Sequence, residues 1–328
     1  MPDFVFATCL PGIERALKLD VAHRRPELRF SYSRPGLVTF KSTRSVTPED
    51  EPGSAFARVW GKSLGAFRTP ADAVRTLAPL GVQRIHVFGR DQEERPDLVP
   101  WRHELASVAP LGAASHGDLV ADVVVADGEP AWGGLHRAGA NHLAVPGGDF
   151  EVAMPSESPS RAFAKIEEMI RWADLPIRVG DVAVELGSAP GGAALALAIR
   201  GVTVYGVDPA AMDPGVLAYV GPSGARVHHL ATKVSALRWE SLPAHVDWLV
   251  SDMNLAPQVV IHELSRLLPA IRRGLRGAVL TLKLNDWSFV SELPSLGKRL
   301  EELGLAPLRM RHLMAHRREI GAVALLRR

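Results

Sequence analysis

A glycine-rich turn between a β-rich run and a helix-forming run carries the strongest chemical signal in the sequence. Residues 182–186 are short and β-rich, and an alanine- and leucine-rich segment begins at Ala193. Between them stand Gly187, Ser188, Ala189, Pro190, Gly191 and Gly192. A strand, a tight glycine turn and a helix N-terminus let the backbone pass close to a bound ligand. The alternative is a glycine turn that only packs the helix on the strand.

The spacing of this turn separates it from other nucleotide-binding loops. The Gly-Lys-Ser at residues 61–63 has Phe56 where a P-loop requires its first glycine, and the turn itself contains no such tripeptide. The turn reads G-x-x-P-G-G, which differs from the dinucleotide pattern G-x-G-x-x-G. Asp208 follows the next β-rich run, and an acid at this place suits a hydrogen bond to a ribose.

Two charged residues interrupt or directly follow apolar runs farther along. Asp252 comes after residues 248–251, where an aspartate is often only a helix cap. Lys283 stands inside residues 278–284, which otherwise read as a buried strand. Because buried charges are rare unless they are paired or functional, Lys283 is a candidate for chemistry.

The segments that must position these residues alternate between β-rich and helical runs after residue 155. Strands are expected at 182–186, 203–207, 248–251 and 278–284, with helices that begin near Phe163 and at 193–200, 258–274 and 291–303. Such alternation predicts a doubly wound, mostly parallel α/β sheet covered on both faces. A last strand over 320–326 is expected to pair antiparallel at the edge of this sheet.

The first 155 residues have a different pattern. Strands are expected at 3–7, 37–40, 84–88 and 119–126, helices after residue 12 and at 71–80, and a loop at 47–54. Asp127-Gly128 is a hairpin signal. This part is therefore predicted to be α+β, with partly antiparallel pairing.

Four short motifs together resemble the FtsJ-like ribose 2′-O-methyltransferases. They are Glu185–Gly192, Val207–Pro214, Val250–Met253 and Thr281–Leu284. Within that group the sequence is most similar to the RlmM-type enzymes of bacterial large-subunit ribosomal RNA, which carry a THUMP-containing module before the catalytic domain. The motifs Phe6–Gly12, Ala57-Arg58 and Ser158–Ala162 resemble that module. The likeness is specific over residues 155–328 and looser before them.

The resemblance implies both a fold and a division of the chain. Residues 156–328 would form a Rossmann-like class I S-adenosylmethionine-dependent methyltransferase domain. Residues 1–155 would form an α+β RNA-binding module, ferredoxin-like over about 1–54 and THUMP-like over about 55–155. With S-adenosylmethionine as the cofactor, its binding residues would be Glu185, Gly187, Ser188, Ala189, Pro190, Gly191, Gly192, Asp208, Thr232 and Asp252.

The catalytic set of the family is Lys-Asp-Lys-Glu, which matches Lys165, Asp252, Lys283 and Glu319. A ribose 2′-hydroxyl is a poor nucleophile, so a base must take its proton as it attacks the sulfonium methyl group. Lys283 is expected to be this base, which requires its pKa to fall from about 10.4 toward neutrality through desolvation and the nearby cation Lys165. Asp252 and Glu319 are expected to orient Lys283 and the hydroxyl.

Other interpretations of these residues and of the function remain open. Residues 229–235 lack the acid that usually holds the adenine amino group, so Thr232 or a backbone carbonyl is expected to replace it. Taken singly, Lys165 would fit a solvated helix face and Glu319 a surface partner for arginines. Two other functions remain open: a catalytically silent RNA-binding relative, because the adenine-side acid is missing, and a small-molecule methyltransferase.

The distribution of charge indicates which kind of partner the protein binds. With 38 Lys+Arg and 36 Asp+Glu the net charge is only +2, but basic residues gather over 15–44, 266–276 and 309–328. These clusters favour an RNA partner, by resemblance 23S-type ribosomal RNA. The sequence does not predict the oligomeric state.

Other features predict a cytoplasmic protein without a membrane span. No run of 18 uncharged apolar residues occurs, the N-terminus lacks a secretory leader, and Cys9 is the single cysteine. The histidine pairs His228-His229 and His312/His316, the latter at helical spacing, lack an accompanying carboxylate motif. No metal is therefore expected.

Overall fold

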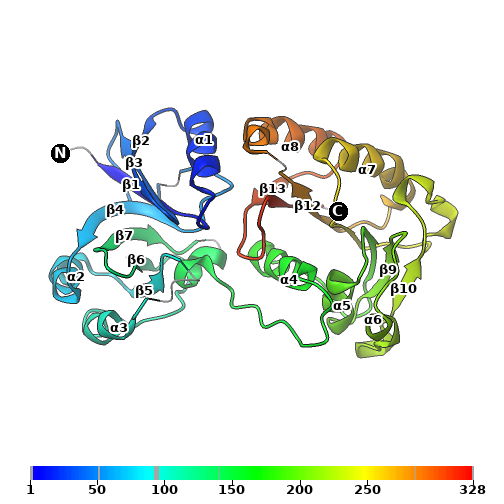
Figure 1. Ribbon diagram of the computed structural model, residues 1–328, viewed down its shortest axis with the longest axis horizontal. Coiled ribbons are helices and arrows are strands. Elements are labelled where there is room, and N and C mark those ends of the chain that lie inside the picture. Colours follow the sequence, from blue (N-terminus) through cyan, green and yellow to red (C-terminus); the bar gives the residue numbers. More distant parts are fainter. Residues whose placement is uncertain (1–2, 51, 92–95, 140, 285, 327–328) are drawn as a thin grey trace. The chain divides into compact units, whose positions relative to one another are not determined.

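A computed structural model describes residues 3–50, 52–91, 96–139, 141–284 and 286–326, which form two compact units (Figure 1). The units are residues 1–150 and 151–328. The division predicted at residue 155 lies a few residues beyond this boundary. Arg327 and Arg328, counted above among the C-terminal basic residues, lie outside the described residues.

The first unit is built on one seven-stranded sheet. Its spatial order is β2 (Leu28–Arg34), β3 (Leu37–Ser42), β1 (Phe4–Thr8), β4 (Trp60–Phe67), β7 (Ala131–Arg137), β6 (Leu119–Val125) and β5 (Arg84–Gly89). β5 and β6 are parallel, and the other neighbouring pairs are antiparallel. The α+β organisation predicted for this part is confirmed. Because β1 pairs with both β3 and β4, the sheet continues across residue 54, and the ferredoxin-like and THUMP-like subdivision stays a prediction.

In the described part of this unit, three α-helices pack against the sheet. α1 (Glu14–Arg24) packs on β2 and β3, while α2 (Pro70–Leu77) and α3 (Val99–Leu105) pack beside β4 and β5 (Figure 1). Thr69 and Asp72 start α2 with a capping box, in which each side chain accepts from the other's backbone N–H. Ile85 and Val123 face the apolar core under α2 and α3. Since side chains alternate along a strand, His86 and Asp122 point to the opposite face.

The second unit is built on another seven-stranded sheet. Its order is β10 (Val227–Leu230), β9 (Thr203–Val207), β8 (Val182–Leu186), β11 (Trp248–Ser251), β12 (Gly277–Lys283), β14 (Glu319–Leu325) and β13 (Leu308–Arg311). β10 through β12 are parallel, and β14 is antiparallel to both of its neighbours. The prediction that the last strand lies at the edge is wrong, because β13 pairs outside it. β13 reads Leu-Arg-Met-Arg, which lacks the β-branched and aromatic residues that signal a strand.

Helices cover both faces of this sheet, as predicted. They are α4 (Ala162–Ala173), α5 (Gly192–Ile199), α6 (Pro214–Ala218), α7 (Pro257–Ile271) and α8 (Leu293–Glu302). α4 and α5 lie on one face and α7 and α8 on the other (Figure 1). The predicted doubly wound, Rossmann-like α/β fold is confirmed. Its parallel strands end at one edge, where open α/β sheets bind their ligands.

None of the helices in the described part of the chain is long and apolar enough to cross a membrane.

Candidate active site

The turn after β8 brings its backbone close to the segment that follows β11. Gly187 has φ +78°, and a Cβ there would lie 2.8 Å from Cα of Met253. Gly191, the N-cap of α5, has φ +113°, and a Cβ there would lie 2.6 Å from Sδ of Met212. A side chain at either position would strain the backbone and occupy this space. The geometry therefore requires the glycines on which the sequence argument depended.

A buried pair lies beneath the turn. The hydroxyl of Ser188 donates to Oε2 of Glu185 at 2.7 Å. Burial raises the pKa of the Glu185 carboxyl to about 8, and the nearby carboxylates of Asp252 and Asp208 act in the same direction. Glu185 is therefore mostly protonated at neutral pH, unlike an exposed glutamate.

Asp208 joins the turn to the end of β9. Its carboxylate accepts from the backbone N–H of Ala189 at 3.2 Å and from that of Ala210 at 2.8 Å. The ring of His229 lies 2.9 Å from the carbonyl of Asp208. The two backbone N–H bonds fix the carboxylate for which the sequence predicted a ribose contact.

A cavity of about 430 Å³ opens beside Gly187 and Asp208. Its other lining residues are Val207, Pro209, Lys233, Val234, Ser235, Met253, Asn254, Leu255, Val259 and Glu263. Thr232 stands beside this wall rather than in it, and its hydroxyl donates to the carbonyl of Lys233. Sequence reasoning placed no function on Glu263, because it lies on α7, far along the chain from the glycine turn.

Glu263 is held in the cavity wall by Arg266. The guanidinium donates to Oε2 of Glu263 at 3.0 Å and also to the carbonyls of Val234 and Leu237. One arginine therefore ties α7 to the segment after β10. Glu263 supplies a carboxylate in the part of the site where residues 229–235 have none.

The four residues matched to the family's catalytic set meet at the carboxyl ends of the central strands. Nζ of Lys165 lies 3.2 Å from Asp252 and also pairs with Glu319. Nζ of Lys283 lies 3.3 Å from Asp252 and 3.0 Å from Glu319. Each lysine thus contacts both acids, which makes a ring of alternating charges with no net charge. The four side chains are at most 15% exposed.

The prediction that the pKa of Lys283 falls is wrong for the protein without bound RNA. Desolvation lowers the pKa of this amine, but Asp252 and Glu319 outweigh desolvation, so the pKa lies above its ordinary value. At Glu319 burial raises the pKa, yet Lys165 and Lys283 outweigh it, and the net pKa is lowered. Lys283 is therefore protonated at neutral pH and lies beside an ionised Glu319.

The loop before β14, which leads into Glu319, is tied to α4 by Glu168, a residue that the sequence did not single out. Glu168, buried on α4, accepts from the backbone N–H of Ala315 at 2.7 Å. Nδ1 of His316 accepts from the backbone of Leu313, and burial lowers the pKa of His316 well below its usual value. His312 and His316, four residues apart in the sequence, both lie in this loop and not on a helix.

The chain is similar to curated proteins named ribosomal RNA large subunit methyltransferase M. It is 34% identical over 192 residues to the protein of Chromohalobacter salexigens, which covers 55% of this chain and 50% of that protein. It is 32% identical over 193 residues to that of Thauera aminoaromatica, and it spans about half the length of both relatives. The chain resembles the RlmM-type proteins. The protein of Laribacter hongkongensis is 28% identical over 346 residues, which cover 94% of this chain and 93% of that relative.

Solved structures resemble the chain more weakly. TrmN from Thermus thermophilus aligns over 99% of this chain and 100% of its own, with a TM-score of 0.38 and 16% identity. Fibrillarin from Aeropyrum pernix aligns over 62% of this chain and 81% of its own, with a TM-score of 0.39 and 19% identity. No protein-family model matches the chain. The fold assignment therefore rests on the strand order. The similarity to the RlmM-type proteins rests on the sequence.

Proposed function

We propose that the protein transfers the methyl group of S-adenosylmethionine to a ribose 2′-hydroxyl in large-subunit ribosomal RNA. The observation that carries the proposal is the ring of Lys165, Asp252, Lys283 and Glu319 beside the glycine turn. Four charged side chains from four separate elements converge where a doubly wound sheet binds its ligand. The similarity to proteins named as ribosomal RNA methyltransferases supports this choice of reaction and substrate.

The residues around the cavity fit S-adenosylmethionine, which supplies an electrophilic methyl group on a positively charged sulfur. Gly187 leaves room for a ligand where a Cβ would meet Met253. Asp208, fixed by two backbone donors, is placed to accept from ribose hydroxyls. Gly187, the first residue of the G-x-x-P-G-G turn, lines the cavity together with Asp208, and the buried hydrogen bond from Ser188 to Glu185 fixes the start of the turn.

Glu263 takes the place of the adenine-side acid that residues 229–235 lack. Its carboxylate lines the same cavity as Asp208 and Ser235. Arg266 holds one oxygen of that carboxylate, which restricts its motion. A fixed carboxylate is a good acceptor for the exocyclic amino group of adenine. This assignment replaces the expected role of Thr232.

Lys283 is the base in this proposal, and it must lose its own proton before it can accept one. Bound RNA excludes water from the ring and so disfavours the charged amine, which lowers the pKa of Lys283. Lys165 contacts the same two carboxylates and stabilises them when Lys283 becomes neutral. The neutral amine would then accept the proton of the 2′-hydroxyl. S-adenosylmethionine, when bound, would supply the methyl group to that oxygen and leave as S-adenosylhomocysteine.

The first unit contributes RNA contacts. Arg29 and Lys41 lie directly opposite each other on β2 and β3, and both are exposed. Like charges at opposed positions destabilise a strand pair, and an RNA phosphate would relieve this repulsion. Other basic residues of this segment are partly neutralised, since Arg24, Arg25 and Arg44 pair with acids.

Methyl transfer to defined RNA tests the proposal. The protein would be incubated with methyl-labelled S-adenosylmethionine and either large- or small-subunit ribosomal RNA from a strain that lacks its own enzyme of this type. Label in the large-subunit RNA alone is expected. No label on naked RNA or on ribosomal particles, although the protein binds the cofactor in calorimetry, would reject the RNA substrate. No cofactor binding at all would reject the methyltransferase assignment.

A further inference from the structure

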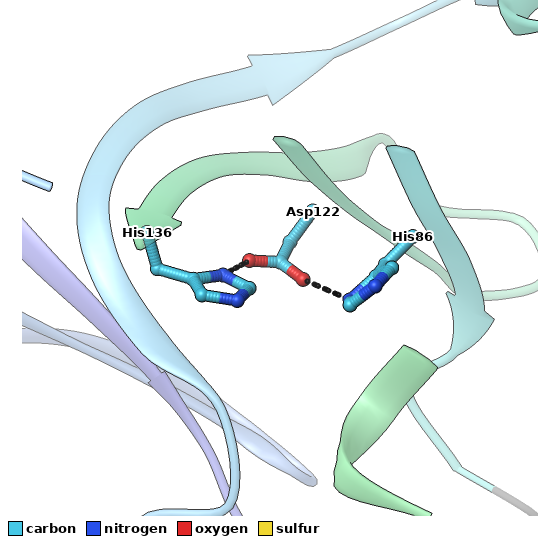
Figure 2. Close-up of side chains that lie close together, drawn as sticks. All are labelled: His86, Asp122 and His136. Atoms are coloured by element: carbon cyan, nitrogen blue, oxygen red, sulfur yellow. Dashed lines mark hydrogen bonds and ion pairs between the residues drawn. The ribbon is translucent and has the colours of Figure 1, made fainter. Parts of the chain in front are cut away.

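A second cluster of ionisable side chains lies in the first unit, on the sheet face opposite α2 and α3. Among the described residues, His86, Asp122 and His136 form a group whose candidate ligand atoms all lie within 4.8 Å of one another. All three side chains point toward one another between the strands (Figure 2). Each is at most 1% exposed. Nothing in the proposed methyl transfer uses this cluster, which we name the His-Asp-His trio.

Strand register brings the His-Asp-His trio together. His86 on β5 lies directly opposite Asp122 on β6, so their side chains share a face. Asp122 lies opposite Gly134 on β7, and His136, two residues farther along, points to the same side. Gly134 has no side chain, and the ring of Phe6 occupies the space beside it, since a Cβ there would lie 2.0 Å from Cε1 of Phe6.

The hydrogen bonds of His136 show which of its nitrogens carries a hydrogen, and they leave its other nitrogen facing a carboxylate oxygen. Nε2 of His136 lies 2.9 Å from the carbonyl of Leu143, and a carbonyl can only accept, so Nε2 carries a hydrogen. Nδ1 of the same ring lies 2.5 Å from Oδ2 of Asp122. In the neutral ring this Nδ1 is a lone pair that faces a carboxylate oxygen. Two acceptors approach this closely only when a cation, either a proton or a metal ion, lies between them.

The other half of the trio favours the metal ion. Nδ1 of His86 lies 3.5 Å from Oδ1 of Asp122, which is long for a hydrogen bond. Both ring nitrogens of His86 and Oδ1 of Asp122 are buried. None of these three atoms has a hydrogen-bond partner among the described residues. Ligands held about 2.0–2.1 Å from a tetrahedral Zn²⁺ are themselves about 3.3 Å apart. The separation of His86 and Asp122 is thus close to that of two metal ligands.

We propose that the His-Asp-His trio binds one divalent transition-metal ion, with Zn²⁺ as the ion that suits two imidazoles and a carboxylate. The contact between His136 and Asp122 lengthens as the ion replaces the proton. The carbonyl of Leu143 orients the ring of His136 from outside, the arrangement common among metal-ligating histidines. Because the ligands come from β5, β6 and β7, the ion ties these strands together and stabilises the first unit. This site is independent of the proposed methyl transfer.

Metal content tests the site directly. Tag-free full-length protein would be purified without chelator, and its zinc, cobalt, nickel, manganese and iron would be measured by plasma mass spectrometry. About one equivalent of metal per chain is expected. After removal of the metal, Co²⁺ should bind with visible absorption bands, and the melting temperature should rise when Zn²⁺ is restored.

Matched variants locate the metal. Asp122→Asn and His86→Asn should lose it, whereas His316→Asn, at a buried histidine of the other unit, should keep it. Metal retained by all three variants would place the ion elsewhere and overturn the proposal. Wild-type protein that is folded by circular dichroism, yet carries no metal and binds neither Zn²⁺ nor Co²⁺, would also overturn it and make the trio a proton-bridged pair. The wild-type result decides the question even if a ligand variant fails to fold.

Discussion

Lys283 and Glu319 are directly paired across β12 and β14, and Nζ of the lysine lies 3.0 Å from Oε2 of the glutamate. Strand register sets this contact, since Lys283 ends one strand and Glu319 begins its antiparallel neighbour. Groups held by strands are positioned more tightly than groups held by loops. The proposed base is therefore oriented by the backbone itself, with Lys165 and Asp252 completing the ring.

Removal of the Lys283 amine should abolish methyl transfer and leave cofactor binding intact. General-base catalysis contributes about 10²–10⁴-fold, so Lys283→Ala should lower kcat by at least about 10²-fold. Single-turnover methylation and calorimetry with S-adenosylhomocysteine would measure the two effects. Lys298→Ala, at an exposed lysine on α8, is the control and should keep full activity. Activity of Lys283→Ala near that of the control would exclude Lys283 as the base.

Glu319→Gln should destabilise the protein by an amount that depends on pH. The pKa of Glu319 is depressed in the fold, so its contribution is present above the ordinary value of 4.5 and is lost as the pH falls through the lowered value. We expect a loss of about 3 kcal/mol at pH 7, because the change leaves two buried lysines with a single acid. Urea unfolding from pH 3 to 8 would measure the loss, with exposed Glu302→Gln as the control. A loss equal at all pH values would contradict the charged ring.

Gly187→Ala should prevent cofactor binding. Its Cβ would lie 2.8 Å from Cα of Met253, on a backbone with positive φ. Gly180→Ala is a matched control, because Gly180 also has positive φ, +91°, but a Cβ there would have no atom within 4 Å. Both variants should lose stability through strain, which is about 1–2 kcal/mol for such a residue. Calorimetric binding equal in the two variants would refute the role of Gly187 in the cavity.

Glu263→Leu should weaken cofactor binding through the adenine amino group. A hydrogen bond to a charged group contributes about 1.5–3 kcal/mol, so affinity for S-adenosylhomocysteine should fall about 10–100-fold. The 6-oxo analogue S-inosylhomocysteine lacks that amino group and should bind wild type and variant almost equally. If Glu263 only holds Arg266, both ligands should lose the same affinity. The two calorimetric titrations therefore distinguish contact from support.

The double variant Arg29→Gln/Lys41→Gln should bind RNA more weakly than the wild-type protein, and its binding should depend less on salt. The slope of log K against log[salt] should become shallower by about 1–2, which corresponds to two lost phosphate contacts. Filter binding of a large-subunit RNA fragment at several salt concentrations would measure it. The double variant Arg75→Gln/Lys298→Gln removes the same charge elsewhere and should leave the slope unchanged. Equal slopes in both double variants would exclude this part of β2 and β3 from the RNA interface.

The sequence was informative where one residue type has one structural consequence. Gly187 lies between a strand and a helix that were both predicted, and its positive φ is what a tight turn requires. Strands without a β-rich pattern were missed. β4 contains Gly61 and Gly65, and β10 is half histidine, so neither has the composition that identifies strands.

Features that depend on residues far apart in the chain could not be predicted. The direction of the pKa shift at Lys283 follows from two acids, one directly after β11 and one on β14, and no local pattern gives their distances. Glu263 enters the cavity because Arg266 fixes it there. His86, Asp122 and His136 meet only through the pairing of three strands.

Alkaline digestion of labelled RNA tests the central claim most directly. A methyl group on a ribose 2′-oxygen removes the hydroxyl that attacks the neighbouring phosphate, so that linkage survives alkali. RNA labelled by the wild-type protein should yield its label in alkali-resistant dinucleotides, and RNA treated with Lys283→Ala should yield none. Label recovered in mononucleotides would show methylation of a base, and it would contradict the assignment of the charged ring to a ribose hydroxyl.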